Sequence, residues 1–405
     1  MSSPPFKVRT ICAFVHLAPA DVTSPLSLSP LAEKFKAAVS GLNATKADLE
    51  AKNFEVQTCR IGTNSFTEYL PITDLPAFEA SLSSIDDLLA SLSLDFFSFG
   101  PCFTPSQTTT LAPLIVHASP RFSVSSSIPP CDIAHANAAA DLVISLSTST
   151  PGGLGNFRYC AQSSSSLGRN SPFFPAGHCA SGSPFGGRIG MAFGLENGRL
   201  ANEGLGKCKS LEDVGTVFHD HYAAALAPVV AAVSARCEKL GFEYVGVDTS
   251  LNPSLDAEGS IGLALESLPG VYGGVGGLGI MAAAAACTTC IQSLPFSLTG
   301  YCGVMLPVCE DHRLSLIQAT PAERKYSVAH LMNVSSVCGV GVDTVPLAGD
   351  TPPAAIAGLI LDVAGLGARW NKMLSVRVFP VPNMQPGEMT TFDSPFLCNT
   401  KVFSL

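Results

Sequence analysis

Charged residues are scarce in this chain. They make up 14% of its 405 residues, whereas soluble domains usually contain about 25%. Such a low fraction indicates either a membrane protein or a compact protein that buries much of its surface. A membrane-spanning helix needs about 20 consecutive apolar residues. The longest apolar stretch, 270–287, is interrupted by six glycines, which favours close packing inside a protein. We therefore expect no contact with a membrane.

The chain also lacks a cluster of Lys and Arg residues. Its formal net charge is -9, and binding to a nucleic-acid backbone needs a basic patch, so we expect no nucleic-acid partner. The first ten residues lack the apolar segment of a secretory signal. Most of the 14 cysteines stand in apolar contexts, where cysteine behaves as a small hydrophobic residue. These features predict a cytoplasmic protein with free thiols.

Motifs of nucleotide-binding proteins and of serine hydrolases are missing as well. The glycine-rich segment 270–279 (GVYGGVGGLG) matches neither G-x-x-x-x-G-K-[ST] nor a dinucleotide fingerprint placed after a strand. Its glycines favour close packing of a helix over nucleotide binding. No G-x-S-x-G sequence is present, which argues against a serine hydrolase of the α/β type.

Strand and helix patterns alternate along the chain. Apolar runs such as 8–15 and 55–60 are separated by helical patterns such as 31–54. This alternation predicts an α/β fold with substantial parallel pairing, and we expect residues 1–405 to form a single domain.

Two local expectations accompany this fold. The apolar run 142–147 is predicted to be a strand that follows a helix. The range 148–187 is rich in Ser, Gly and Pro and is predicted to form a long loop, which in a compact domain is often functional.

The C-terminal half repeats a five-residue sequence. Val-Gly-Val-Asp-Thr occurs at 245–249 and again at 340–344. We expect each copy to be a strand that ends at its Asp-Thr, and ligands of parallel α/β sheets bind at the carboxyl ends of strands. Asp248 and Asp343 would then converge on one cation. The alternative is that each Asp caps a turn or a helix.

Further acidic residues stand beside apolar or glycine-containing segments: Glu310, Asp311 and Asp350. Hard oxygen ligands of this kind suit Mg²⁺, and Mn²⁺ as an alternative. We therefore predict a magnesium site whose ligands are drawn from Asp248, Glu310, Asp311, Asp343 and Asp350.

Three residues are candidates for catalysis, namely Asp343, His312 and Lys372. His312 directly follows two acids, which makes it the candidate general base. A surface histidine that balances local negative charge is the alternative.

Five residues are candidates for substrate binding. Arg60 and Arg377 would bind an anionic group, and Phe173, Phe174 and Tyr272 would line an apolar cavity. A structural role in packing or at the surface is the alternative for each of them.

Several long motifs carry a family resemblance. CGVMLPVCED (302–311), SSVCGVGVDTVPLAGDT (335–351) and RVFPVPNMQPGEMTTFDSPFL (377–397) resemble domain of unknown function 711. The resemblance covers almost the whole chain and implies an α/β barrel of two half-barrels, similar to pyruvate formate-lyase. The chain lacks the Arg-Val-x-Gly-Tyr signature and the adjacent cysteine pair of glycyl-radical enzymes, so radical chemistry is not implied.

A second resemblance is to fungal sesquiterpene cyclases that use a two-magnesium cluster. It implies a magnesium-dependent, homodimeric lyase of secondary metabolism that cyclises farnesyl diphosphate. Cations would bind the diphosphate and aromatic faces would stabilise the carbocation. Two alternatives stay open. One is a metal-assisted hydrolase or carbon–carbon enzyme acting on a small polar metabolite, and the other is a non-catalytic dimeric binding protein.

Overall fold

The computed structural model describes residues 4–166, 170–320 and 325–405, and in these ranges the chain forms nine strands and twelve α-helices. The strands are β1 (Lys7–Val15), β2 (Val56–Thr63), β3 (Phe97–Cys102), β4 (Phe122–Ile128), β5 (Tyr159–Ser163), β6 (Gly190–Glu196), β7 (Glu243–Asp248), β8 (Gly341–Ala348) and β9 (Ser375–Val381). The helices are α1 (Pro30–Glu50), α2 (Leu75–Ser91), α3 (Pro105–Thr110), α4 (Ala112–Ala118), α5 (Ile133–Ser149), α6 (Gly198–Leu205), α7 (Val217–Leu240), α8 (Ile261–Glu266), α9 (Ile280–Gln292), α10 (His312–Ala319), α11 (Val328–Cys338) and α12 (Pro353–Trp370).

All nine strands belong to one sheet, in the order β7-β6-β1-β2-β3-β4-β5-β9-β8. Strands β1 to β5 run parallel to one another. At each end the direction reverses, because β6 pairs antiparallel with β1 and β9 pairs antiparallel with β5. Strands β6 and β7 are parallel to each other, as are β8 and β9. The sheet therefore consists of a five-stranded half and two flanking pairs that run the opposite way.

An extended segment, 297–309, joins the two edge strands. On one side it forms parallel bridges with β7 and the residues after it, including Leu251 with Val304. On the other side, the backbone N–H of Val308 donates to Asp343 O in β8. The segment thus lies between β7 and β8, and together with β6 to β9 it forms a second half of the barrel beside β1 to β5. This arrangement confirms the predicted α/β fold and its barrel-like form.

Local sequence explains how the elements form. Every residue of β1 from Thr10 to Val15 is buried, as expected of a parallel strand covered on both faces. Helix α1 begins at Pro30 because the Ser29 hydroxyl accepts from the backbone N–H of Ala32, a standard N-cap. Its buried residues, among them Phe35, recur with helical spacing, so one face of the helix packs on the sheet.

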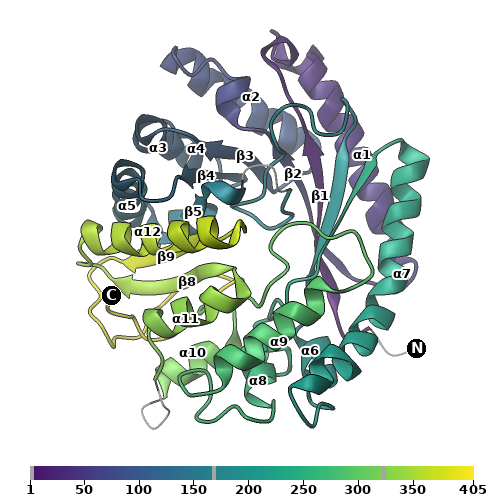
Figure 1. The fold of residues 1–405 in the computed structure, drawn as a ribbon. Helices are drawn as coiled ribbons and strands as arrows, with labels where there is room; N and C mark the ends of the chain where they lie inside the picture. The colour runs from purple at the N-terminus through teal and green to yellow at the C-terminus, as the bar shows by residue number, and fades with distance from the viewer. Residues whose placement is uncertain (1–3, 167–169, 321–324) are drawn as a thin grey trace.

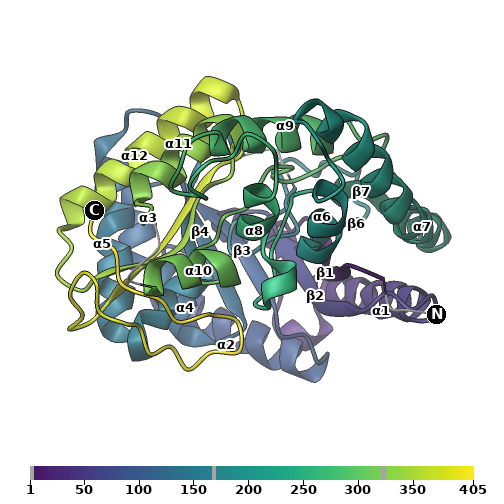
Figure 2. The ribbon, with the colours of Figure 1, turned by 90° about the horizontal axis from the view of Figure 1, so that it is seen from below.

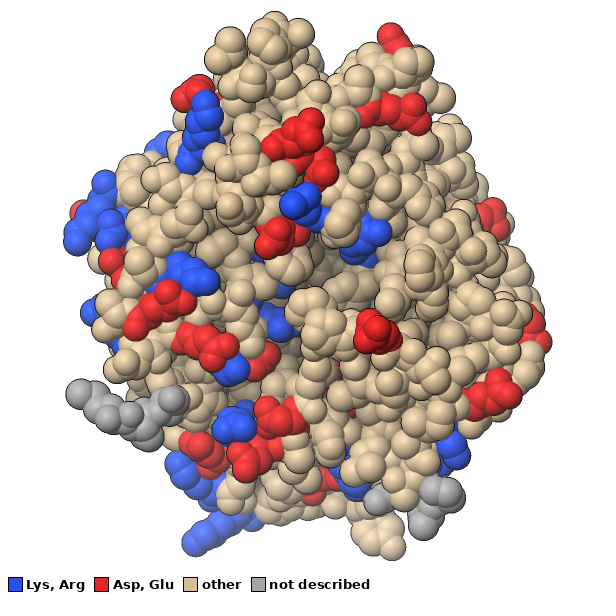
Figure 3. Space-filling view, turned by 180° about the vertical axis from the view of Figure 1, so that it is seen from behind, with Lys and Arg blue, Asp and Glu red and all other residues tan. Residues whose placement is uncertain are grey.

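Helices form an outer layer around the strands, as Figures 1 and 2 show. Helices α1 and α7 pack side by side, and α12 packs against α5 and β5. Within the described ranges, α12 is the one helix long and apolar enough to span a membrane by length and composition. Core helices of α/β proteins pass the same test. On the face in Figure 3, acidic and basic side chains are interspersed and no single sign covers it.

Two local predictions differ from the structure. The run 142–147 is part of α5, which is continuous from Ile133 to Ser149, because its apolar residues fall on one helical face rather than alternating. The range 148–187 is not a single loop, since it contains β5 and two short 3-10 segments. Residues 167–169 of that range lie outside the described residues.

Candidate functional site

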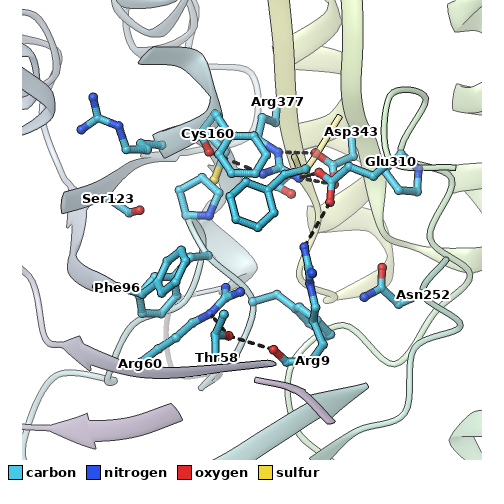
Figure 4. Close-up of a pocket in the computed structure, with 18 of the residues that line it drawn as sticks. Arg9, Thr58, Arg60, Phe96, Ser123, Cys160, Asn252, Glu310, Asp343 and Arg377 are labelled. Carbon is cyan, nitrogen blue, oxygen red and sulfur yellow. Dashed lines mark hydrogen bonds and ion pairs between the residues drawn. The ribbon is translucent and has the colours of Figure 1, made fainter. Parts of the chain in front are cut away.

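A cavity of about 360 Å³ lies inside the barrel, between its two halves. This volume is in the range of small-molecule sites. Arginines on β1 and β2 form one wall (Figure 4). The facing wall is formed by the first residues of β8 and β9 and by Glu310, which follows segment 297–309. Aromatic side chains line the rest of the cavity, namely Phe96, Phe157, Phe173, Phe174, Tyr301 and Phe396.

Arg60 is the most enclosed cation of the first wall, with 7% of its surface exposed. Thr58 and Arg60 are two residues apart on β2, so both side chains leave the same face of the strand. The Nε of Arg60 donates to the Thr58 hydroxyl over 3.0 Å. The guanidinium carbon lies 5.0 Å and 5.2 Å from the ring centroids of Phe96 and Phe174. Its faces are therefore in cation–π contact.

No acidic side chain pairs with Arg60 within the described residues. The other arginines of the cavity do have partners. Arg158 donates to backbone carbonyls such as Val116 O, and Arg121 pairs with Asp86. Burial lowers the pKa of Arg60, and the nearby charge of Arg9 lowers it further. The charge of Glu310 opposes this shift, but it does not form an ion pair with Arg60.

The facing wall is built around Arg377. Asp343 and Arg377 are register partners on β8 and β9, and the guanidinium binds Asp343 through two hydrogen bonds of 2.6 Å and 2.9 Å. A third, also of 2.6 Å, joins Arg377 to Glu310 Oε1. Phe157 covers the guanidinium at 4.9 Å. Such bidentate pairing fixes the geometry of both partners.

Glu310 lines the cavity between Arg377 and Arg9. Its second oxygen, Oε2, lies 4.0 Å from Arg9 across the cavity. Burial raises the pKa of Glu310, the charge of Arg377 opposes this shift, and the charge of Asp343 adds to it. A raised pKa is the direction that general acid–base chemistry needs of a carboxyl group.

Two of the predicted metal ligands have structural roles instead. The Asp248 carboxylate accepts from the backbone N–H groups of Tyr301 and Cys302. The Asp311 carboxylate caps α10 and also accepts from the N–H groups of Ile261 and Gly262. Both residues are fully buried and neither lines the cavity.

The remaining predicted residues lie elsewhere. Asp350 is exposed and contacts Gln385. Neither His312 nor Lys372 lines the cavity. His312 is the first residue of α10, and Lys372 donates to the backbone carbonyl of Cys338. Tyr272 is 75% exposed and is not a cavity residue.

The five predicted carboxylates therefore do not surround one cation. Of the five, only Glu310 and Asp343 line the cavity, and both are already bound by Arg377. Across residues 4–166, 170–320 and 325–405, no group of three or more His, Cys, Asp and Glu side chains is placed to hold a metal ion. The donor set does not fit the predicted magnesium cluster.

Six of the predicted residues line the cavity: Arg60, Phe173, Phe174, Glu310, Asp343 and Arg377. Sequence reasoning missed Arg9, although an arginine inside the apolar run 8–15 is itself a signal. It also missed Phe396, which stacks on Phe157 at 6.0 Å. A contact between residues so distant in sequence leaves no local pattern.

Residues 1–393 match the family described as "Uncharacterised ACR (DUF711)". The chain belongs to this family. Related UPF0210 proteins occur in Methanopyrus kandleri, at 34% identity over 37% of this chain and 33% of the relative, and in Syntrophobacter fumaroxidans, at 34% identity over 38% and 34%. A UPF0210 protein of Lacticaseibacillus paracasei is 41% identical over 24% of this chain and 21% of the relative. Each match spans about a third or less of the curated relative.

Membership of DUF711 corrects the predicted relation to fungal sesquiterpene cyclases. The family is described as uncharacterised, and the matching proteins of bacteria and archaea are UPF0210 proteins, not terpene cyclases. The assignments to sesquiterpene formation, terpene biosynthesis and secondary metabolism are therefore wrong.

Proposed function

We propose that this DUF711 protein is an enzyme that binds a small anionic metabolite inside the barrel. Arg60 would bind the anionic group, and Glu310 would act as general acid or base. The observation that carries the proposal is the buried guanidinium of Arg60, which faces the cavity and has no acidic partner among the described residues.

Electrostatics supports an anionic ligand. A buried charge without a counter-charge is costly, and proteins usually pair it. A carboxylate or phosphate on the ligand would supply the missing charge. The guanidinium faces of Arg60 are covered by Phe96 and Phe174, so its edge is the part left for a ligand. An arginine edge matches the two oxygens of such groups.

The second wall supports chemistry rather than binding alone. Arg377 is already engaged by Asp343 and Glu310, so we assign it a positioning role. It holds one oxygen of Glu310 and leaves Oε2 toward the cavity. Glu310 could then move a proton to or from a ligand bound at Arg60. Hydrolysis and carbon–carbon chemistry on a small polar metabolite would both use such a group.

Ligand binding tests the proposal directly. The melting temperature of the full chain is measured with a panel of small carboxylates and phosphates, because a ligand that binds only the folded state raises it. We expect stabilisation of the wild type and its loss in Arg60→Met. Arg369→Met is the matched control, since Arg369 is exposed and contacts Trp370. An Arg60→Met response equal to that of the wild type would refute the proposal.

Catalysis is separated from binding by Glu310→Gln. We expect this variant to retain anion binding and to lose turnover of any substrate found in the panel by roughly 100-fold or more. Unchanged turnover would leave a binding protein as the better description. Magnesium dependence and dimer formation stay predictions, which EDTA treatment and sedimentation velocity would test.

A further inference from the structure

We infer that the anionic group is a phosphate dianion held jointly by Arg9 and Arg60, rather than a singly charged carboxylate. The inference rests on the proposed function, because it presupposes an anionic metabolite in the cavity. It adds the charge of the ligand and a second arginine to the binding site.

Arg9 and Arg60 project from neighbouring strands. Thr58 connects them, since its hydroxyl accepts from Arg60 Nε over 3.0 Å and donates to the backbone carbonyl of Arg9 over 2.8 Å. Both side chains rise from the same wall into the cavity in Figure 4. Because Arg9 and Arg60 both line the cavity, one ligand group can face both guanidiniums.

The existing partners of Arg9 are distant. Its nitrogens lie 3.7 Å from Glu196 and 4.0 Å from Glu310, beyond hydrogen-bond length. Arg377, by contrast, binds both of its carboxylates at 2.6 Å. The only side-chain hydrogen bond of Arg9 in the described chain goes to the neutral Gln57, over 3.0 Å. Arg9 thus retains capacity for an anion.

The two guanidiniums also repel each other. The charges that act on the pKa of Arg60 are those of Arg9, Cys12, Glu310 and Arg377. Arg377 balances only one of the two carboxylates that it binds, Asp343 and Glu310. With Glu310 protonated, as a general acid is, Arg9, Arg60, Arg377 and Asp343 together carry two net positive charges, which a dianion would balance and a monoanion would not.

Geometry agrees with this charge count. Aromatic rings cover the guanidinium faces, with Phe396 lying 5.9 Å from the guanidinium carbon of Arg9. Each arginine is left to bind by its edge. A phosphate monoester has three terminal oxygens and can accept from two edges at once, whereas a carboxylate has two oxygens and suits one fork.

Methyl phosphate and methyl sulfate test the charge, because they have the same shape but differ by one charge at neutral pH. Their affinities for the full chain are measured by titration calorimetry at pH 7.5, with acetate as the carboxylate. We expect methyl phosphate to bind about tenfold or more tightly than either, since it gains additional charge-assisted hydrogen bonds. At pH 5 the preference should shrink, because a phosphate monoester loses its second charge near pH 6.

Variants assign the preference to the two arginines. Arg9→Met should abolish the preference for methyl phosphate over methyl sulfate, whereas Arg60→Met should weaken all three probes. Arg60→Lys keeps the charge and serves as a folding control, and Arg369→Met should behave as wild type. Equal affinities for methyl phosphate and methyl sulfate, with binding intact, would overturn the dianion inference alone. If none of the probes binds, the proposed function fails as well.

Discussion

The two copies of Val-Gly-Val-Asp-Thr are identical in sequence and different in role. In both, the glycine has a positive φ, 139° at Gly246 and 113° at Gly341, a region that favours glycine. A side chain there would clash with a neighbouring backbone, at Ser297 for the first copy and at Ser375 for the second. The repeat thus encodes a strand position at which a neighbouring backbone comes too close for any side chain.

After the glycine the copies diverge. In the first, β7 ends at Asp248, whose carboxylate is enclosed by backbone N–H donors of the turn at Tyr301 and Cys302. In the second, β8 runs on to Ala348, and Asp343 faces the cavity on Arg377. A short sequence therefore specifies a backbone conformation, whereas the surroundings specify what the carboxylate does.

Removing Asp248 should have the largest effect on stability. Asp248→Ala leaves the buried N–H groups of Tyr301, Cys302 and Ser250 without an acceptor. Because each unsatisfied group costs about 1–3 kcal/mol, we expect a loss of roughly 3 kcal/mol or more, measured by urea denaturation. The exposed Asp362→Ala should change stability by less than about 0.5 kcal/mol. A loss of stability no larger than that of Asp362→Ala would contradict the structural role that we assign to Asp248.

The pH dependence of stability should also distinguish the first copy. Burial raises the pKa of Asp248, although its hydrogen bonds oppose the shift. A carboxyl group with a raised folded pKa adds stability below its unfolded pKa of about 3.9, and this contribution is lost as pH rises through the folded pKa. The stability of the wild type relative to Asp248→Asn should therefore fall as pH rises. A difference that grows with pH would contradict the assignment.

Changing Asp343 should affect the site more than the fold. Its side chain is 25% exposed, so we expect Asp343→Asn to cost only about 1 kcal/mol. The pKa of Glu310 should fall, because the charge of Asp343 raises it and Arg377 would be left to Glu310 alone. Carbon-13 NMR titration of Glu310, assigned with Glu310→Gln, measures this. An unchanged pKa would show that the three residues do not act together.

Replacing the threonine at the end of each copy should give the smallest difference in stability between the two copies. Thr344 has a φ of 46°, which is strained for a β-branched residue, and its hydroxyl accepts from Cys309 N. Thr344→Gly should therefore change stability by less than about 1 kcal/mol. Thr249→Gly removes a hydrogen bond of 2.9 Å to Ile291 O and relieves no such strain, so it should cost more. Thermal unfolding of both variants decides the order.

Part of the fold followed from local patterns. Alternating apolar runs and helical spacing predicted strands such as β1 and helices such as α1, because each buries a face on the sheet. The same reasoning wrongly predicted a strand at 142–147, because a short apolar run fits a strand or a buried helix equally well. The chain direction within the sheet, with β6 and β9 reversed, left no local signal.

The sequence by itself determined the family, the α/β class and the presence of Arg60, Arg377 and Asp343 as candidates for a polar site. Only the tertiary structure decided which acids act together. Glu310 and Asp343 both bind Arg377 because segment 297–309 lies against β8. Asp248 instead accepts a hydrogen bond from the backbone of the same segment, at Tyr301. Hydrogen bonds and ion pairs extend over only a few ångströms, so a carboxylate's role depends on which distant residues folding brings beside it.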